Sequence, residues 1–162
     1  MVASVLNNVG GLVWPLFKSM PTGNVIVFIF NCVNVYIYCL WVWERFLFAE
    51  RLVRVFTSLH FIVEVNNDLT DDELMKCMKV VSERDHQRYD CFVCCILSHG
   101  ATAAVYGTDG RTVPIKDLTI PFKPTSCPSL SDKPKMFFIQ ACQGTVKQLG
   151  SQCKLFAFTF FT

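Results

Sequence analysis

Two unbroken apolar runs of strand length in the middle of the chain constrain its fold more than any other feature. The first run is CFVCCIL, residues 91–97, and the second is MFFIQ, residues 136–140. Apolar runs that do not alternate with polar residues are typical of strands covered on both faces, as in parallel sheets. We therefore expect both runs inside a parallel sheet that has helices on its two faces.

The segment before the first run predicts a strand and a helix. Residues 59–66, LHFIVEVN, alternate with period two, which indicates a strand. Thr70 and Glu73 have the spacing of a capping box, and a helix from about Asp71 to Glu83 follows because apolar residues then recur at helical spacing. These apolar residues are Leu74, Cys77, Met78 and Val81.

The segment between the two runs carries turn signals. Asp109 and Gly110 lie between short β-prone stretches at 105–107 and 112–113, a pattern that predicts a hairpin. Prolines at positions 121, 124 and 128 indicate an irregular connection to the second run. The order of elements predicts an α/β fold with a mostly parallel sheet, in which active sites lie outside the carboxyl ends of the strands.

Two chemically capable side chains follow these strands: His99 comes after the first apolar run and Cys142 after the second. A thiol is a useful nucleophile only as a thiolate, and a neighbouring imidazole can accept its proton and later donate it to a leaving amine. The backbone N–H groups of Gly100 and Cys142 would form an oxyanion hole. The pattern favours acyl transfer through a thioester.

Charge and cysteine content exclude some classes of partner and compartment. Fifteen Lys and Arg against thirteen Asp and Glu leave a net charge of +2. This charge is too small for sequence-independent binding to nucleic acid. The nine cysteines, an odd number, lack the spacing of a secreted disulfide scaffold, and the first residues lack a signal-peptide pattern. A reducing, cytoplasmic location is therefore expected.

The two ends of the chain differ from its middle. Residues 1–43 hold one charged residue, and residues 155–162 hold none. Residues 24–43 would cross about 30 Å of hydrocarbon as a helix, so a membrane anchor is one interpretation. Asn31 and Asn34 near the middle of this segment count against a span, and its Val, Ile, Phe and Tyr content is as compatible with a strand as with a helix. We expect residues 1–58 and 150–162 to lie outside the domain that residues 59–149 form.

The residues around Cys142 read QACQG at positions 140–144, and His99 lies 43 residues earlier. This matches the cysteine signature of caspases, whose histidine lies about 50 residues upstream. Stretches 86–100, 106–110 and 128–135 also look like the caspase large subunit. Over about residues 59–149 the chain resembles the caspase family of peptidases.

The resemblance implies a cytosolic cysteine endopeptidase that cuts proteins after aspartate and acts in apoptosis, without a metal or cofactor. It implies that Cys142 is the nucleophile and His99 the general acid and base. Gly100 and the Cys142 amide would then bind the oxyanion, and Gln140 would line the pocket for the substrate aspartate. The implied fold is the three-layer caspase fold.

Departures from the family point to an incomplete domain. Arg45, Arg51 and Arg54 do not match the segment that carries the family's first pocket arginine. Only twenty residues follow Cys142, where the small subunit would come, and no Asp or Glu follows Asp132 for activating cleavage. We expect the first strand and the small-subunit strands to be missing, which leaves three strands, two open edges and poor solubility.

Two hypotheses of function follow from these departures. The first is a caspase large-subunit fragment that needs a caspase small subunit or a full-length caspase as its dimer partner. The second is an inactive truncated form that regulates such a partner, in the cytoplasm or anchored to a membrane through residues 24–43.

Two other features receive structural interpretations. Cys91, Cys94 and Cys95 resemble half a zinc site, but no second ligand pair has the spacing to complete it. On a strand, Cys94 would face away from the other two cysteines. His86 lies in a charged stretch and is expected to be a solvated loop residue.

Overall fold

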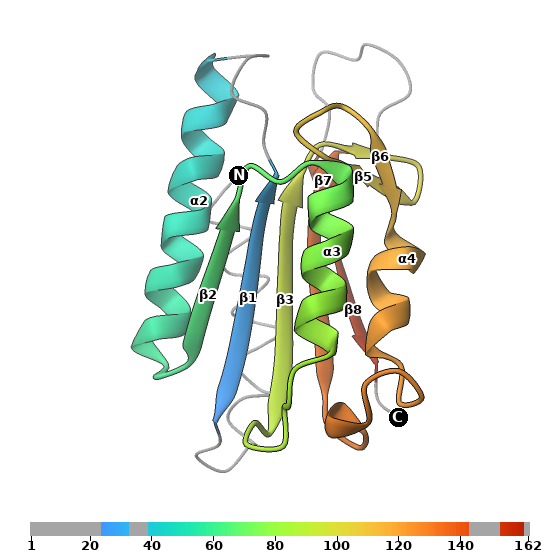
Figure 1. Ribbon diagram of the computed structural model, residues 1–162. Helices are drawn as coiled ribbons and strands as arrows, with labels where there is room; N and C mark the ends of the chain where they lie inside the picture. The colour runs from blue at the N-terminus through green and yellow to red at the C-terminus, as the bar shows by residue number, and fades with distance from the viewer. Residues whose placement is uncertain (1–23, 33–38, 143–152, 161–162) are drawn as a thin grey trace.

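A computed structural model describes residues 24–32, 39–142 and 153–160, and the side chains of residues 24–32 and 49–140. Its centre is a sheet in the order β2-β1-β3-β7-β8 (Figure 1). The first four strands run parallel, and β8 is antiparallel to β7. This confirms the mostly parallel sheet. The strands are β1 (Val25–Cys32), β2 (Ile62–Asn67), β3 (Cys91–Ser98), β7 (Lys135–Cys142) and β8 (Cys153–Phe160).

Strand β1 corrects the interpretation of the apolar front segment. It lies between β2 and β3 and is buried along its whole length. A strand covered on both faces has the same unbroken apolar sequence as a membrane segment, and its β-branched and aromatic residues favour the strand. Part of residues 24–43 therefore belongs to the sheet, and residues 33–38 lie outside the described part. None of the described helices is long and apolar enough to cross a membrane.

The expectation of three strands with a missing first strand is therefore wrong for the described sheet, which has five. Strand β1 comes before the predicted strands in the chain, and β8 covers the side of β7 that we expected to be open. The edges of the described sheet are β2 and β8. On β2, Ile62 and Val65 remain 49% and 40% exposed, so one apolar edge persists.

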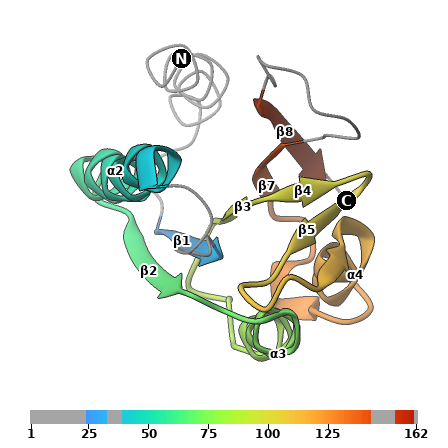
Figure 2. The ribbon, with the colours of Figure 1, turned by 90° about the horizontal axis from the view of Figure 1, so that it is seen from above.

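Helices cover both faces of the sheet, as Figure 2 shows from above. Helix α2 (Cys39–Ser58) packs on one face through Ala49, Leu52 and Phe56. Helix α3 (Asp71–Ser82) and the short α4 (Ile115–Thr119) pack on the other face. The alternate residues of β1, β3 and β7 divide between these two cores. This is the three-layer arrangement that the family resemblance implies.

The end of α2 explains why β2 starts later than expected. The N–H of Phe61 donates to the carbonyl of Phe56 at 3.1 Å, and His60 has a φ of 61°. This is a Schellman-type helix end, in which a left-handed residue follows the helix. Residues 59–61 therefore close α2, and the predicted strand at 59–66 begins only at Ile62.

The predicted helix after β2 is confirmed with its cap. Helix α3 begins after Thr70, whose hydroxyl accepts from the N–H of Glu73, while the Glu73 carboxylate accepts from the N–H of Thr70. The hairpin is also confirmed: β5 (Ala104–Tyr106) and β6 (Thr112–Pro114) pair antiparallel, and Gly110 has a φ of 80° in the turn. The connection to β7 includes short 3-10 turns, η1 (Ile120–Phe122) and η2 (Pro128–Leu130).

His86 is buried rather than solvated, which corrects the sequence interpretation. Its side chain is 1% exposed, and its Nε2 lies 2.7 Å from the carbonyl oxygen of Val81. The ring contacts Phe92 edge-on. Charged neighbours in the sequence suggested solvent, but contacts with Val81 on α3 and Phe92 on β3 bury the ring.

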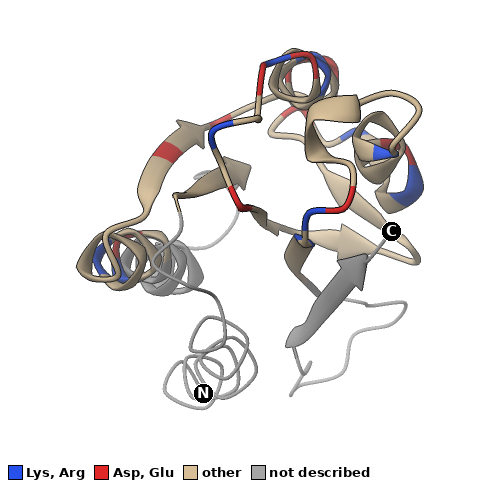
Figure 3. Ribbon diagram, turned by 90° about the horizontal axis from the view of Figure 1, so that it is seen from below, with Lys and Arg blue, Asp and Glu red and all other residues tan. Residues whose placement is uncertain are grey.

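Charged side chains lie mainly on helices and loops. Figure 3, seen from below, shows Lys, Arg, Asp and Glu on α3, α4 and the lower loops, with both signs interspersed. Arg84 and Glu64 form one ion pair, with Nη1 2.8 Å from the carboxylate. The mixture of signs agrees with the small net charge.

Candidate active site

The candidate site lies where β3 and β7 end side by side. The two strands pair in parallel, and Leu97 on β3 is the register partner of Gln140 on β7. His99 follows β3 directly, and Cys142 is the last residue of β7. Both positions therefore lie two residues beyond one register pair, at the same end of the sheet.

The backbone around His99 is held by Ser98, a residue to which the sequence interpretation gave no role. The buried Ser98 hydroxyl donates to the carbonyl oxygen of Tyr106 at 2.5 Å and accepts from the Tyr106 N–H at 3.1 Å. The carbonyl oxygen of His99 also accepts from the Tyr106 N–H, at 2.9 Å. The sequence feature that could have indicated this role is Ser98 itself, the one polar residue at the end of an otherwise apolar strand.

Gly100 begins the short strand β4 (Gly100–Ala101), which pairs antiparallel with β5. Strand β4 also contacts β7, the strand that ends at Cys142. The backbone of Gly100 is thus held close to the end of β7. This placement is compatible with the oxyanion role proposed for its N–H, which remains a prediction.

Gln140 is partly buried near the end of β7. Its side-chain oxygen Oε1 is fully buried and has no hydrogen-bond partner within the described part of the chain. An amide oxygen accepts hydrogen bonds and a carboxylate has no proton to donate, so a substrate aspartate would be bound through the amide N–H of Gln140 and not through this oxygen. The role of Gln140 in an aspartate pocket stays a prediction from the family resemblance.

The side chain of Cys142 lies outside the described residues, so the position of Cys142 in the site is given by its backbone alone. The backbone places Cys142 opposite Cys153 of β8 in the antiparallel pair. The structure thus brings the backbones of His99, Gly100, Gln140 and Cys142 to one end of the sheet.

The cysteines inside β3 are not competing nucleophiles. Burial raises the pKa of Cys91 and Cys95 to about 12 and raises the pKa of Cys94 well above its ordinary value. These thiols therefore stay protonated at neutral pH. Cys91 and Cys95 lie in one core and Cys94 in the other, on the opposite face of the sheet, which confirms the predicted alternation.

The arginines of α2 lie away from Gln140. Arg51 is exposed, and Arg54 lies 3.8 Å from the exposed Glu50 on the same helix. The side chain of Arg45 is outside the described part. Helix α2 contacts β1 and β2, whereas Gln140 is on β7 beyond β3. The described arginines of α2 therefore do not complete an aspartate pocket.

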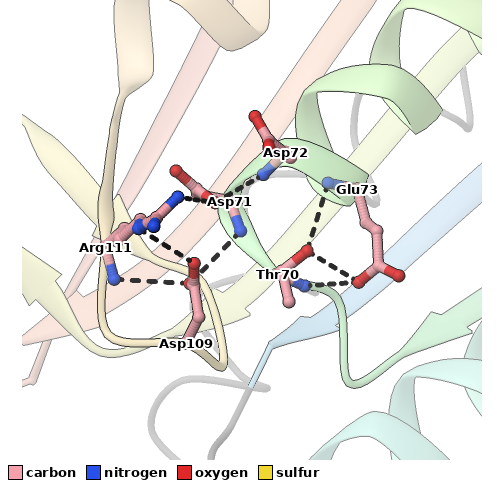
Figure 4. A network of polar contacts seen from close by, with 6 residues as sticks. All are labelled: Thr70, Asp71, Asp72, Glu73, Asp109 and Arg111. Carbon is pink, nitrogen blue, oxygen red and sulfur yellow. Dashed lines mark hydrogen bonds and ion pairs between the residues drawn. The ribbon is translucent and has the colours of Figure 1, made fainter.

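A polar network ties the segment after His99 to the start of α3 (Figure 4). Asp109, in the β5–β6 turn, accepts from the N–H of Asp71 and from the N–H of Arg111, each at 3.3 Å. The Arg111 guanidinium lies 4.0 Å from the Asp71 carboxylate. The hairpin next to the candidate site is therefore fixed to a helix that packs on the sheet.

A histidine directly after β3 and a cysteine at the end of the neighbouring parallel strand β7 lie at one end of the sheet, as the sequence predicts for an α/β protein with cysteine-based acyl-transfer chemistry. The chain matches the caspase domain model over residues 49–155. It belongs to the caspase family. The match begins ten residues before the predicted boundary at residue 59 and ends six residues after the one at 149.

Three relatives show how much of the family the chain contains. It is 50% identical to mouse caspase-8 over 101 residues, 62% of this chain and 21% of that protein. It is 48% identical to human caspase-9 over 109 residues, 63% of this chain and 26% of that protein. It is 44% identical to golden hamster (Mesocricetus auratus) caspase-3 over 102 residues, 63% of this chain and 36% of that protein. The chain therefore spans between about a fifth and a third of these relatives.

Proposed function

We propose that this chain is the large-subunit part of a caspase-like cysteine endopeptidase that cleaves cytoplasmic proteins after aspartate during apoptosis. The observation that carries the proposal is the register of β3 and β7, which puts His99 and Cys142 at the same end of the sheet. The family membership supports the same chemistry.

In the proposed mechanism, the thiolate of Cys142 attacks the carbonyl carbon of the peptide bond that follows the substrate aspartate. His99 accepts the thiol proton and donates it to the leaving amine. The N–H groups of Gly100 and Cys142 stabilise the oxyanion. Water then hydrolyses the thioester, with His99 as the general base.

Gln140 would donate its amide N–H to the substrate aspartate. A carboxylate leaves water at a high cost in free energy unless a cationic or donor partner receives it. The described arginines of α2 do not provide that partner. We therefore expect the chain to act with a caspase small subunit or a full-length caspase, which would supply the remaining pocket.

The test mixes the purified chain with a full-length caspase-8 whose own nucleophile is replaced by alanine, and then adds a fluorogenic aspartyl peptide. The proposal predicts hydrolysis that requires both proteins and that disappears with Cys142→Ala. Hydrolysis that survives Cys142→Ala, or a mixture with no hydrolysis, would contradict it.

A second candidate function is an inactive regulator that pairs with full-length caspases. The position of the described arginines on α2, away from Gln140, favours this alternative. Addition of the chain to active caspase-8 distinguishes the two. A regulator co-precipitates with caspase-8 and changes its activity equally well as the wild-type chain or as Cys142→Ala.

A further inference from the structure

The antiparallel pair β7–β8 aligns two cysteines. Cys142 is the last residue of β7 and Cys153 is the first residue of β8, and the two are register partners. Within the described sheet, no other register pair consists of two cysteines. The nucleophile of the proposed function is thus directly opposite a second thiol-bearing residue.

The backbone spacing of such a pair suits a disulfide. Residues directly opposite one another in an antiparallel pair have Cα atoms about 4.5–5.5 Å apart. Disulfides form where the Cα atoms are about 4.4–6.8 Å apart. The strands therefore hold the Cα atoms of Cys142 and Cys153 within the range of separations that disulfides span.

We propose that Cys142 and Cys153 are a redox pair in which an oxidant of the peroxide class closes a reversible disulfide that blocks the nucleophile. The pairing follows from strand register alone, and the loss of activity rests on the proposed function. A reducing compartment keeps such a pair open, and cytosolic disulfides are characteristically transient and regulatory.

The chemistry balances as two successive displacements, the first at a peroxide oxygen and the second at sulfur. The Cys142 thiolate attacks a peroxide oxygen, the O–O bond breaks, and water leaves with a proton from the medium, which gives a sulfenic acid. The Cys153 thiolate then attacks that sulfur, the S–S bond forms, the S–O bond breaks, and a second water leaves. Two thiols lose two electrons and two protons, and the peroxide is reduced to two waters. A small thiol such as glutathione reverses the reaction by exchange.

The sequence makes the disulfide directly observable. Trypsin releases Cys142 in the peptide 136–147 and Cys153 in the peptide 148–154, each with a single cysteine. The full chain is oxidised with hydrogen peroxide, its remaining thiols are alkylated, and the unreduced digest is analysed by mass spectrometry. We expect the two peptides joined, lighter than their sum by two hydrogens, and separated again by dithiothreitol.

Two controls separate strand register from proximity in the sequence. Cys127 precedes Cys142 by 15 positions and Cys153 follows it by 11, so both are comparably accessible partners in an unfolded chain. The fold predicts the 142–153 disulfide in large excess over the 127–142 disulfide under native conditions, and loss of that excess in guanidinium. Cys153→Ser should abolish the joined peptide and divert Cys142 to sulfinic acid.

The readout does not depend on activity, so the two proposals fail separately. An inactive chain that forms the 142–153 disulfide contradicts only the proposed function. A chain whose Cys142 oxidises to sulfinic acid without the joined peptide, or pairs equally with Cys127, overturns the redox pair.

Discussion

Leu97 and Gln140 are register partners on the parallel strands β3 and β7, and this pairing aligns the ends of both strands. His99 and Cys142 each lie two residues beyond that pair. A shift of register by one residue would exchange the two faces of a strand and separate the site residues. The proposed chemistry therefore depends on the packing of the two apolar strands.

Gln140→Ala should weaken the proposed aspartate pocket. In the proposed pocket the amide N–H of Gln140, near the end of β7, donates to the substrate carboxylate. Loss of a hydrogen bond to a charged group costs about 1.5–3 kcal/mol, which is about 10- to 150-fold in kcat/KM. The measurement is aspartyl-peptide hydrolysis in the reconstituted mixture, with the exposed Gln87→Ala as the matched control. Equal rates for both variants would remove Gln140 from the pocket.

Gly107→Ala should destabilise the chain. A Cβ at position 107 would clash with the backbone nitrogen of Asp71 and would lie 2.7 Å from the backbone carbon of Thr70. Backbone at the start of α3 cannot move away cheaply, so the overpacking should cost about 1–3 kcal/mol of unfolding free energy. Gly110→Asn is the control for backbone strain without a clash, because position 110 has open space and asparagine is among the residues least strained at its φ of 80°, so it should cost less than Gly107→Ala. Urea denaturation compares the two, and similar midpoints would contradict the predicted contact.

Stability should fall as the pH falls below about 6.5, the ordinary pKa of histidine. Burial lowers the pKa of His86, and its hydrogen bond to Val81 only partly opposes this. Its Nδ1 is buried and unpaired, so a proton there would meet no acceptor in the described part of the chain. Between the lowered pKa and about 6.5 the folded chain binds fewer protons than the unfolded chain, so acid favours unfolding.

Urea denaturation between about pH 7.5 and 5.5 checks this pH dependence. His86→Asn should reduce the loss of stability in acid, whereas the exposed His60→Asn should retain it. Titration of the His86 ring by NMR in the unaltered chain gives the same answer if His86→Asn fails to fold. A titration midpoint at or above 6.5 would contradict the account.

Arg84→Lys should lower the unfolding free energy by about 0.5–1 kcal/mol. The Arg84 Nη1 lies 2.8 Å from both carboxylate oxygens of Glu64, and the guanidinium carbon lies 5.3 Å from the centre of the Phe28 ring. A lysine cannot match this planar geometry. Arg88→Lys, an exposed change in the same loop, is the control for the denaturation measurement, and an equal effect of both changes would show that the contacts contribute nothing.

Local sequence patterns predicted the elements on which the site is built. The apolar runs of β3 and β7, the capping box at Thr70 and the turn at Asp109 and Gly110 are governed by neighbouring residues, and each was confirmed. The positions of His99 and Cys142 at strand ends follow from those elements. Their catalytic roles remain predictions, because the side chain of Cys142 lies outside the described part.

Features set by distant parts of the chain were not predictable in the same way. An apolar run such as β1 has the same local pattern in a membrane and between two strands, and only its partners decide between them. His86 lies among charged residues, yet a loop that folds against Phe92 buries it. The role of Ser98 depends on Tyr106, which only the turn after His99 brings close.

The rate at which an aspartyl fluoromethyl ketone alkylates Cys142 tests the central claim most directly, in the mixture of this chain with nucleophile-replaced caspase-8. Tryptic mapping assigns the label, since peptide 136–147 contains Cys142 alone among the cysteines. We predict label on this peptide, with a rate that falls at least about 100-fold in His99→Ala because the general base is lost. Label spread over the other cysteines, or an unchanged rate in His99→Ala, would contradict a Cys142–His99 site.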